Sequence, residues 1–228
     1  LLALSYPLSQ FSRLEMRQTL SYSDKDWYYS RRQAWLNSSF ISFVNDNSLW
    51  GVTGPMDGRR INITLGNTYD FIFSEVNYLT ALIDLRFYQR LSLRTAYAVR
   101  LLSLFNEGRE TRQFYFGGSW DLRGYRRWSL HGERIFLISQ ELRFPLIDGI
   151  GVRLPKFSLG FRSIRGALFL DAGNAWNEEL EGLKGSFGVG VRMRLGYFLV
   201  LRWDFGRRTD FKSISDHTFT QFFFGWDF

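Results

Sequence analysis

Few residues in this 228-residue chain could do acid–base or nucleophilic chemistry. It contains no Cys and only two His, His131 and His217. A hydrolase needs a general base, which is most often His. The one local run of suitable types is Ser215-Asp216-His217, but adjacent side chains on a strand point to opposite faces. No Gly-rich phosphate loop follows a strand and opens a helix. We therefore expect no enzyme, no cofactor and no metal site, and keep a hydrolase as the rival interpretation.

The composition excludes several classes of protein. Lys and Arg number 29 against 22 Asp and Glu, a formal net charge of +7, and 18% of the residues are aromatic. Disordered chains carry few aromatics, and a chain without Cys forms no disulfide scaffold and no Cys/His zinc site. No apolar run reaches the roughly 18–20 residues that a membrane-spanning helix needs. The Arg residues are scattered through apolar segments rather than gathered in a run, so we expect no nucleic-acid partner.

The elements that must position any site alternate in polarity with a period of two. Between residues 186 and 195 the polar face includes Arg192 and Arg194. The apolar face of this segment is formed by Phe187, Val189, Val191, Met193 and Leu195. Such alternation is typical of β-strands with two different faces. It fits a soluble β-sandwich or lipocalin-like barrel as well as a transmembrane β-barrel. Charge on nearly every polar face, with aromatics near the strand ends, favours the barrel, which is apolar outside and polar inside.

The same pattern predicts eleven antiparallel strands. They lie at 1–7, 14–22, 34–46, 59–66, 77–88, 91–105, 134–146, 161–175, 186–195, 197–206 and 217–228. The short connections are 8–13, 89–90 and 196. The longer ones are 23–33, 67–76, 106–133, 176–185 and 207–216. Two further connections, 47–58 and 147–160, fall at positions in the series where a short turn is expected, but they are longer than that. Bacterial barrels have short periplasmic turns and long external loops.

An odd number of strands has a consequence for the whole protein. If the last strand ends on the periplasmic side, the first begins at the outer face. Single-chain bacterial barrels have an even number of strands with both ends inside. We therefore expect at least one further strand upstream, and these 228 residues to be the C-terminal part of a larger barrel.

The longest connection, 106–133, contains an unusual motif. Its centre reads FYFGGSWDLRGY over residues 114–125, with candidate motif residues Gly117, Gly118, Leu122, Arg123, Gly124 and Tyr125. This segment resembles the sixth extracellular loop of the BamA/TamA outer-membrane assembly superfamily, also called bacterial surface antigens. The resemblance implies that 106–133 is a long extracellular loop that folds into the barrel lumen.

Further segments match the same family in order. They are SQELRFP at 139–145, LFLDAGNAW at 168–176, GVGVR at 188–192, and the strands at 196–206 and 217–228. The resemblance is specific over about residues 112–228 and looser before that. It implies an all-β, antiparallel transmembrane β-barrel, with ten or eleven of sixteen strands in residues 1–228.

The resemblance also implies that the loop Arg pairs with acidic residues on the inner wall. By the parity of their strands, Glu141 and Asp171 fall on the polar face. A buried Arg needs such partners, and a guanidinium can bridge two carboxylates. We therefore expect an Arg123–Glu141–Asp171 cluster with a structural role. The alternative is a solvent-exposed Arg123 and a merely hydrated Asp171.

The C-terminus resembles the β-signal of outer-membrane proteins, which the assembly machinery reads by strand pairing. Its candidate residues are Gln221, Phe222, Phe224, Gly225, Trp226 and Phe228. The alternative is an ordinary amphipathic edge strand.

The function that the resemblance implies is insertion, assembly or secretion of proteins at the outer membrane of a Gram-negative bacterium. The expected partners are outer-membrane lipid or lipopolysaccharide, client outer-membrane proteins, and other subunits of an outer-membrane complex. The alternative is a barrel that anchors a soluble domain or a multi-protein complex and has no insertase activity.

Overall fold

The computed structural model describes residues 1–27, 30–154, 157–195 and 199–225, and its regular elements are all β-strands. They are β1 (Leu2–Pro7), β2 (Ser12–Trp27), β3 (Ser30–Asp46), β4 (Leu49–Gly51), β5 (Gly54–Asp70), β6 (Asn77–Arg90), β7 (Ala96–Arg109), β8 (Phe114–Phe116), β9 (Leu130–Gly132), β10 (Arg134–Leu154), β11 (Phe157–Trp176), β12 (Lys184–Leu195), β13 (Leu199–Thr209) and β14 (Ile214–Gly225). Within these ranges no helix is long and apolar enough to cross a membrane.

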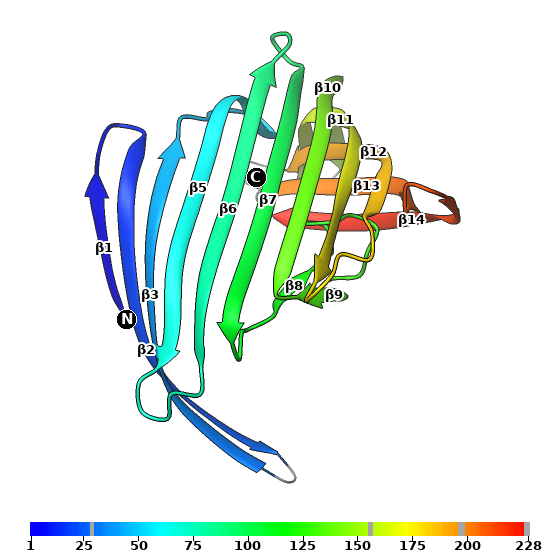
Figure 1. Ribbon diagram of the computed structural model, residues 1–228. Helices are drawn as coiled ribbons and strands as arrows, with labels where there is room; N and C mark the ends of the chain where they lie inside the picture. Colours follow the sequence, from blue (N-terminus) through cyan, green and yellow to red (C-terminus); the bar gives the residue numbers. More distant parts are fainter. Residues whose placement is uncertain (28–29, 155–156, 196–198, 226–228) are drawn as a thin grey trace.

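Eleven long strands form one antiparallel sheet in which each pairs with the next along the chain. The order is β1-β2-β3-β5-β6-β7-β10-β11-β12-β13-β14, with β4 added beside β5 and a separate β8–β9 pair. The sheet curls strongly, so that β12–β14 lie behind the plane of β5–β7 (Figure 1). No pairing joins β1 to β14 among the described residues, and the sheet is a curved wall with two edges. The prediction of an all-β, antiparallel fold with eleven main strands is confirmed.

Polar side chains cover the inner face of this wall and apolar side chains cover the outer face. On β13, Arg202 and Asp204 are buried while Phe205 is exposed. On β11, Asp171 is buried while Leu168 and Leu170 are exposed. A soluble β-sandwich or lipocalin-like barrel turns its apolar face inward, so those alternatives are wrong. The outward apolar surface is the one that a transmembrane barrel presents to lipid.

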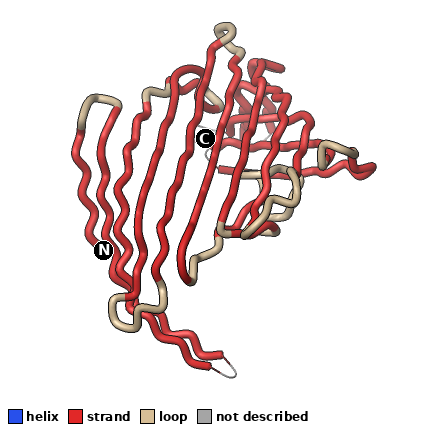
Figure 2. Tube along the Cα trace, in the orientation of Figure 1, coloured by secondary structure: helices blue, strands red, loops and turns tan. Residues whose placement is uncertain are grey.

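Several strands are longer than their apolar pattern predicts. Residues 147–160 were expected as a connection, but β10 runs to Leu154 and β11 starts at Phe157. The expected loop 23–33 is mostly strand, because β2 and β3 stay paired out to Trp27 and Ser30. Figure 2 shows this hairpin extending beyond the rest of the sheet. Ladder hydrogen bonds do not need apolar side chains, so strands continue in water beyond the segment whose outer face is apolar.

Two other expectations concern turns. The strand predicted at 91–105 starts only at Ala96, because residues 91–95 form a turn in which the Leu91 N–H donates to the Thr95 carbonyl at 2.9 Å. The predicted single-residue turn at 196 lies outside the described residues. Two segments that were expected as connections, 47–58 and 106–133, contain the short strands β4, β8 and β9.

Candidate functional site

The loop between β7 and β10, residues 110–133 and here named the inner loop, is an ordered structure of its own. Phe114–Phe116 pairs with Leu130–Gly132 to form a short stem. Beyond the stem, Gly117 and Gly118 have φ of 104° and 112°, the left-handed region that favours glycine. The Trp128 N–H then donates to the Gly117 carbonyl at 3.2 Å. The double glycine of the motif therefore makes the chain turn from the stem into the segment that carries Arg123.

Apolar packing holds the inner loop against the wall. Leu122 is fully buried and Phe116 nearly so. They form a cluster with Leu102 of β7 and with Ile135 and Leu137 of β10. Leu137 and Ile135 lie on the inner face of β10, which explains why this strand carries apolar residues on both faces at this level. The Leu of the motif thus positions the next residue, Arg123, at a fixed height on the wall.

Arg123 reaches β10 and β11 with every part of its guanidinium. Its Nε and Nη2 donate to the two carboxylate oxygens of Asp171 at 2.6 and 2.7 Å, a bidentate pair. Nη1 donates to Glu141 at 3.1 Å, and Nη2 also donates to Ser139 Oγ at 3.2 Å. The guanidinium carbon lies 3.9 Å from the ring centre of Phe169. Arg123 is 3% exposed and Asp171 is not exposed at all, so the alternative of a solvated Arg and a hydrated Asp is wrong.

Glu141 is the shared acceptor of three arginines. Besides Arg123, Arg143 Nε donates to it at 2.9 Å, and Arg192 Nη2 lies 2.6 Å from its carboxylate. Ser139 donates to Asp171 at 2.6 Å. All these charged groups are buried, and such groups are tolerated only when opposite charges and hydrogen bonds surround them. The structure thus brings the three residues of the expected cluster together, and it adds Ser139, Arg143 and Arg192 to them.

The two residues after Arg123 contact the last two strands. The Gly124 N–H donates to Gln221 Oε1 at 2.9 Å, and Gln221 Nε2 donates to the Tyr125 carbonyl at 3.1 Å. Arg208 Nε donates to the Gly124 carbonyl at 2.5 Å, and its guanidinium stacks over the Tyr125 ring. Gly124 has φ of 84°, and a Cβ there would meet the Phe219 ring at 2.5 Å. The Arg-Gly-Tyr motif is therefore the point where β10, β11, β13 and β14 are joined through one loop.

The residues of the expected C-terminal signal divide between two faces of β14. Gln221 points inward to the inner loop, and so does Phe223, whose ring lies edge-on to Trp120 at 4.5 Å. Phe222 and Phe224 are exposed on the outer face, as the pattern predicts. Gly225 pairs with Val200, whereas Trp226 and Phe228 lie outside the described residues.

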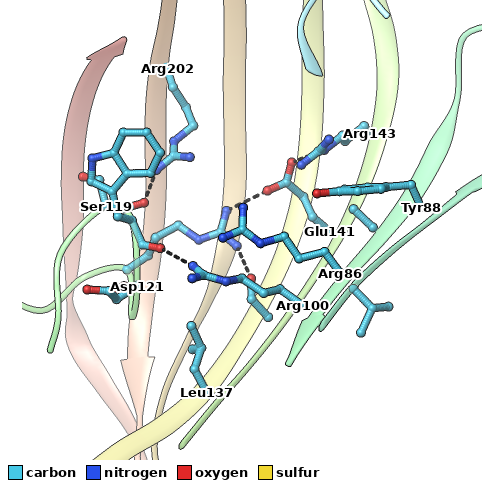
Figure 3. Close-up of a pocket in the computed structure, with 14 residues that line it drawn as sticks. Arg86, Tyr88, Arg100, Ser119, Asp121, Leu137, Glu141, Arg143 and Arg202 are labelled. Atoms are coloured by element: carbon cyan, nitrogen blue, oxygen red, sulfur yellow. Dashed lines mark hydrogen bonds and ion pairs between the residues drawn. The ribbon is translucent and has the colours of Figure 1, made fainter. Parts of the chain in front are cut away.

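A pocket lies between the inner loop and the wall (Figure 3). Arg86, Tyr88 and Arg100 reach it from β6 and β7, Glu141 and Arg143 from β10, and Ser119 and Asp121 from the loop, as the sticks of Figure 3 show. Arg202 of β13 donates to the Ser119 carbonyl across it. Arg86 and Arg100 pair with Asp84 of β6, and Arg123 and Arg143 pair with Glu141. The described residues contain no group of three His, Cys, Asp or Glu that could hold a metal ion.

Sequence reasoning missed the contacts that depend on curvature. No role was expected for Phe169, yet its ring lies inward under Arg123. Gln221 and Arg208 are 96 and 83 positions from Tyr125 in the chain, and nothing in the alternation brings them to the loop. The alternation along β10 and β11 was sufficient to predict that Glu141 and Asp171 point inward, but it predicted none of these loop contacts.

A curved wall with an apolar exterior, a charged interior and a loop fixed inside is the wall of a transmembrane β-barrel protein. The comparison with known families then specifies which kind. A family model described as the Omp85 superfamily domain matches residues 9–226, and the chain belongs to that superfamily. The resemblance found in the sequence to the BamA/TamA superfamily is thereby confirmed.

Solved structures show the same fold, and 53 of their chains match. One is the crystal structure of BamA from Haemophilus ducreyi lacking POTRA domains 1-3, with a TM-score of 0.70 and 15% sequence identity. The match covers 97% of this chain and 53% of that one, so the chain spans about half the length of the structure that it resembles. No curated protein sequence matches the chain.

Proposed function

We propose that this protein takes part in inserting, assembling or secreting proteins at the outer membrane of a Gram-negative bacterium. Membership of the Omp85 superfamily, an outer-membrane assembly and translocation family, supports this proposal. So does the feature that distinguishes the chain from a plain barrel wall, which is the inner loop joined to β10, β11, β13 and β14 through Arg123, Gly124 and Tyr125. The inner loop holds β10, β11 and β13 together with the inner face of β14.

The last strand is the element on which this activity depends. β14 is hydrogen-bonded to β13 from Val200–Gly225 to Thr209–Ile214, and its inner face is held by Gly124 and Trp120 of the loop. Its other edge is the seam at which the barrel would close. A seam edge that opens can template the strand of a client by β-augmentation. The loop would keep β14 in place while client strands add and leave at that edge.

The second candidate function is an anchor for a soluble domain or an outer-membrane complex. One observation favours it, namely that β14 is held both by its ladder to β13 and by the loop, which is the arrangement of a rigid scaffold. In that case the seam edge of β14 would pair permanently with a strand of the same barrel.

An in-cell crosslinking experiment separates the two functions. A photo-crosslinking residue is placed at Thr220, on the outer side of β14, in the full-length protein, and newly made outer-membrane proteins are pulse-labelled. An assembly protein should give crosslinks to labelled precursors that disappear during the chase. Crosslinks only to stable subunits, together with unchanged levels of folded outer-membrane proteins after depletion, would reject the assembly function and support the anchor. Crosslinking from Leu93, exposed in the turn before β7, is the matched control.

A further inference from the structure

A second segment folds onto the inner face from the end opposite the inner loop. Residues 48–57, here named the inner hairpin, include β4, which pairs back onto the start of β5 at Trp50–Pro55 and Gly51–Gly54. Thr53 and Met56 are 5% and 6% exposed, and Pro55 is fully buried. A periplasmic turn in water has no reason to bury a Thr, a Pro and a Met, so these residues pack against something other than their own strands.

The inner hairpin touches the far side of the curved wall. Arg143 of β10 donates from Nη1 to the Pro55 carbonyl at 3.0 Å. Arg165 of β11 places Nη1 3.4 Å from Met56 Sδ, and Arg194 of β12 reaches the Val52 carbonyl at 3.5 Å. These arginines are 88 to 142 positions away in the chain. The hairpin therefore bridges the inner space from β5 to three consecutive strands opposite.

Arg143 connects the inner hairpin to one end of the pocket, which no residue of the hairpin itself lines. Arg143 lines the pocket, pairs with Glu141 and holds Pro55. Tyr88, whose ring lies under the Arg143 guanidinium, lines it too. The other end of the pocket is formed by Ser119, Trp120 and Asp121 of the inner loop. In Figure 3, Tyr88 and Arg143 lie on one side of the pocket and Ser119 and Asp121 lie on the other.

The local sequence is suited to a fold of this kind. Gly58 has φ of 91°, and a Cβ there would meet the Asn47 carbonyl oxygen at 2.5 Å. The Asn47 side chain in turn accepts from the Arg59 N–H at 2.8 Å. This turn closes the β3–β5 ladder at Asp46–Arg60, and the intervening residues are free to leave the plane of the sheet.

We propose that the inner hairpin is a second closure of the barrel interior, which seals it on the side of the short turns while the inner loop seals the other side. The buried Arg143 of β10 and Arg165 of β11 hold it shut through the Pro55 carbonyl oxygen and Met56 Sδ, and the less buried Arg194 of β12 contacts the Val52 carbonyl oxygen. The hairpin is a permeability barrier between the pocket and the solvent on the side of the short turns. This inference goes beyond the proposed function and does not depend on it.

Thiol accessibility in the full-length protein tests the closure. Residues 1–228 contain no Cys, so Ala98→Cys, buried in the pocket next to Tyr88, is a specific reporter once any cysteine outside this range is removed. The reagent is a small water-soluble methanethiosulfonate added to the reconstituted protein. When residues 48–57 are replaced by an Asn-Gly turn, we expect Cys modification to become at least about tenfold faster, since the reporter no longer waits for local opening.

Controls separate closure from misfolding. Gln10→Cys lies exposed in the turn between β1 and β2 and should react at one rate in both backgrounds. The milder Met56→Ala removes the group near Arg165 and should give an intermediate acceleration. An unchanged rate at Ala98→Cys, in proteins that retain heat-modifiable mobility on gels, would overturn the proposal. If the shortened protein does not fold, Met56→Ala alone decides between the two results.

Discussion

Arg123 is the residue whose substitution should lower the free energy of unfolding most. Arg123→Ala leaves Asp171 and Glu141 buried with one partner fewer, and breaking a buried ion pair typically costs about 3–5 kcal/mol. Arg123→Lys keeps the charge but loses the bidentate geometry, so we expect only partial recovery. The free energy of unfolding in urea, followed by heat-modifiability on gels, measures both. Arg126→Ala, exposed in the same loop, is the control, and a similar loss in that variant would show that the cluster is not what matters.

Gly124 makes a second prediction at this scale. Gly124→Ala places a Cβ against the Phe219 ring and strains a backbone with φ of 84°. We expect the inner loop to lose its contacts with β14 and become sensitive to proteases in the intact protein. Gly182→Ala has φ of 137° but meets nothing within 4 Å, so it measures the backbone strain alone. Equal protease sensitivity in the two variants would mean that packing on Phe219 contributes nothing.

The residue scale also shows where sequence reasoning ends. The parity of two strands was sufficient to place Glu141 and Asp171 on the inner face, and the family resemblance supplied Arg123. Gln221 was assigned to a C-terminal signal, yet its side chain bonds the loop on both sides of the Gly124–Tyr125 peptide. That contact exists because the sheet curls until β14 lies opposite the loop, and curvature is not encoded in a period of two.

At the scale of elements, apolar alternation located all eleven long strands but misjudged their ends. The pattern reports the part of a strand with an apolar outer face, whereas the ladder continues through polar residues, as it does in β10 and β11 beyond residue 146. β4, β8 and β9 have three residues each, too few to show a period. Their existence depends on the inner face that they pack against, which only the assembled sheet provides.

The turn between β13 and β14 gives a pH-dependent prediction. Backbone N–H groups of Ser213 and Lys212 donate to the Asp210 carboxylate, and they hold its pKa below the ordinary value of 3.8. The stabilisation is therefore present above that value and lost as the pH falls through the lower, folded pKa. We expect the rate of pepsin cleavage at the exposed Phe211 to rise as the pH falls below about 4, relative to the rate in the Asp210→Asn variant. The Asn amide of that variant does not titrate. A ratio of cleavage rates that is independent of pH would contradict this.

The whole molecule is ordered from inside to outside in the opposite sense to a soluble protein. Arg192, Arg202 and Asp204 are nearly inaccessible, while Ile41, Leu65 and Leu79 are about 60% exposed. In water such an apolar surface would drive aggregation. Burying the charges would cost free energy that no apolar core offsets. In a bilayer the outer face contacts lipid, and the charges gather around a wet or filled interior. The inner loop and the inner hairpin then supply the packing that a soluble core would otherwise provide.

Substitution on the outer face tests this ordering. A charge at an exposed position of a soluble protein changes little, but Arg near the middle of a lipid-facing strand costs about 2–4 kcal/mol. Leu65→Arg, in the middle of the β5–β6 ladder, should therefore lower the free energy of unfolding in lipid vesicles by that amount. Leu93→Arg, 89% exposed in the turn between β6 and β7, should leave it unchanged, because that turn lies beyond the apolar band. If both variants behaved alike, the outer face of β5 would not be in contact with lipid, and the wall would have to be covered by protein there instead.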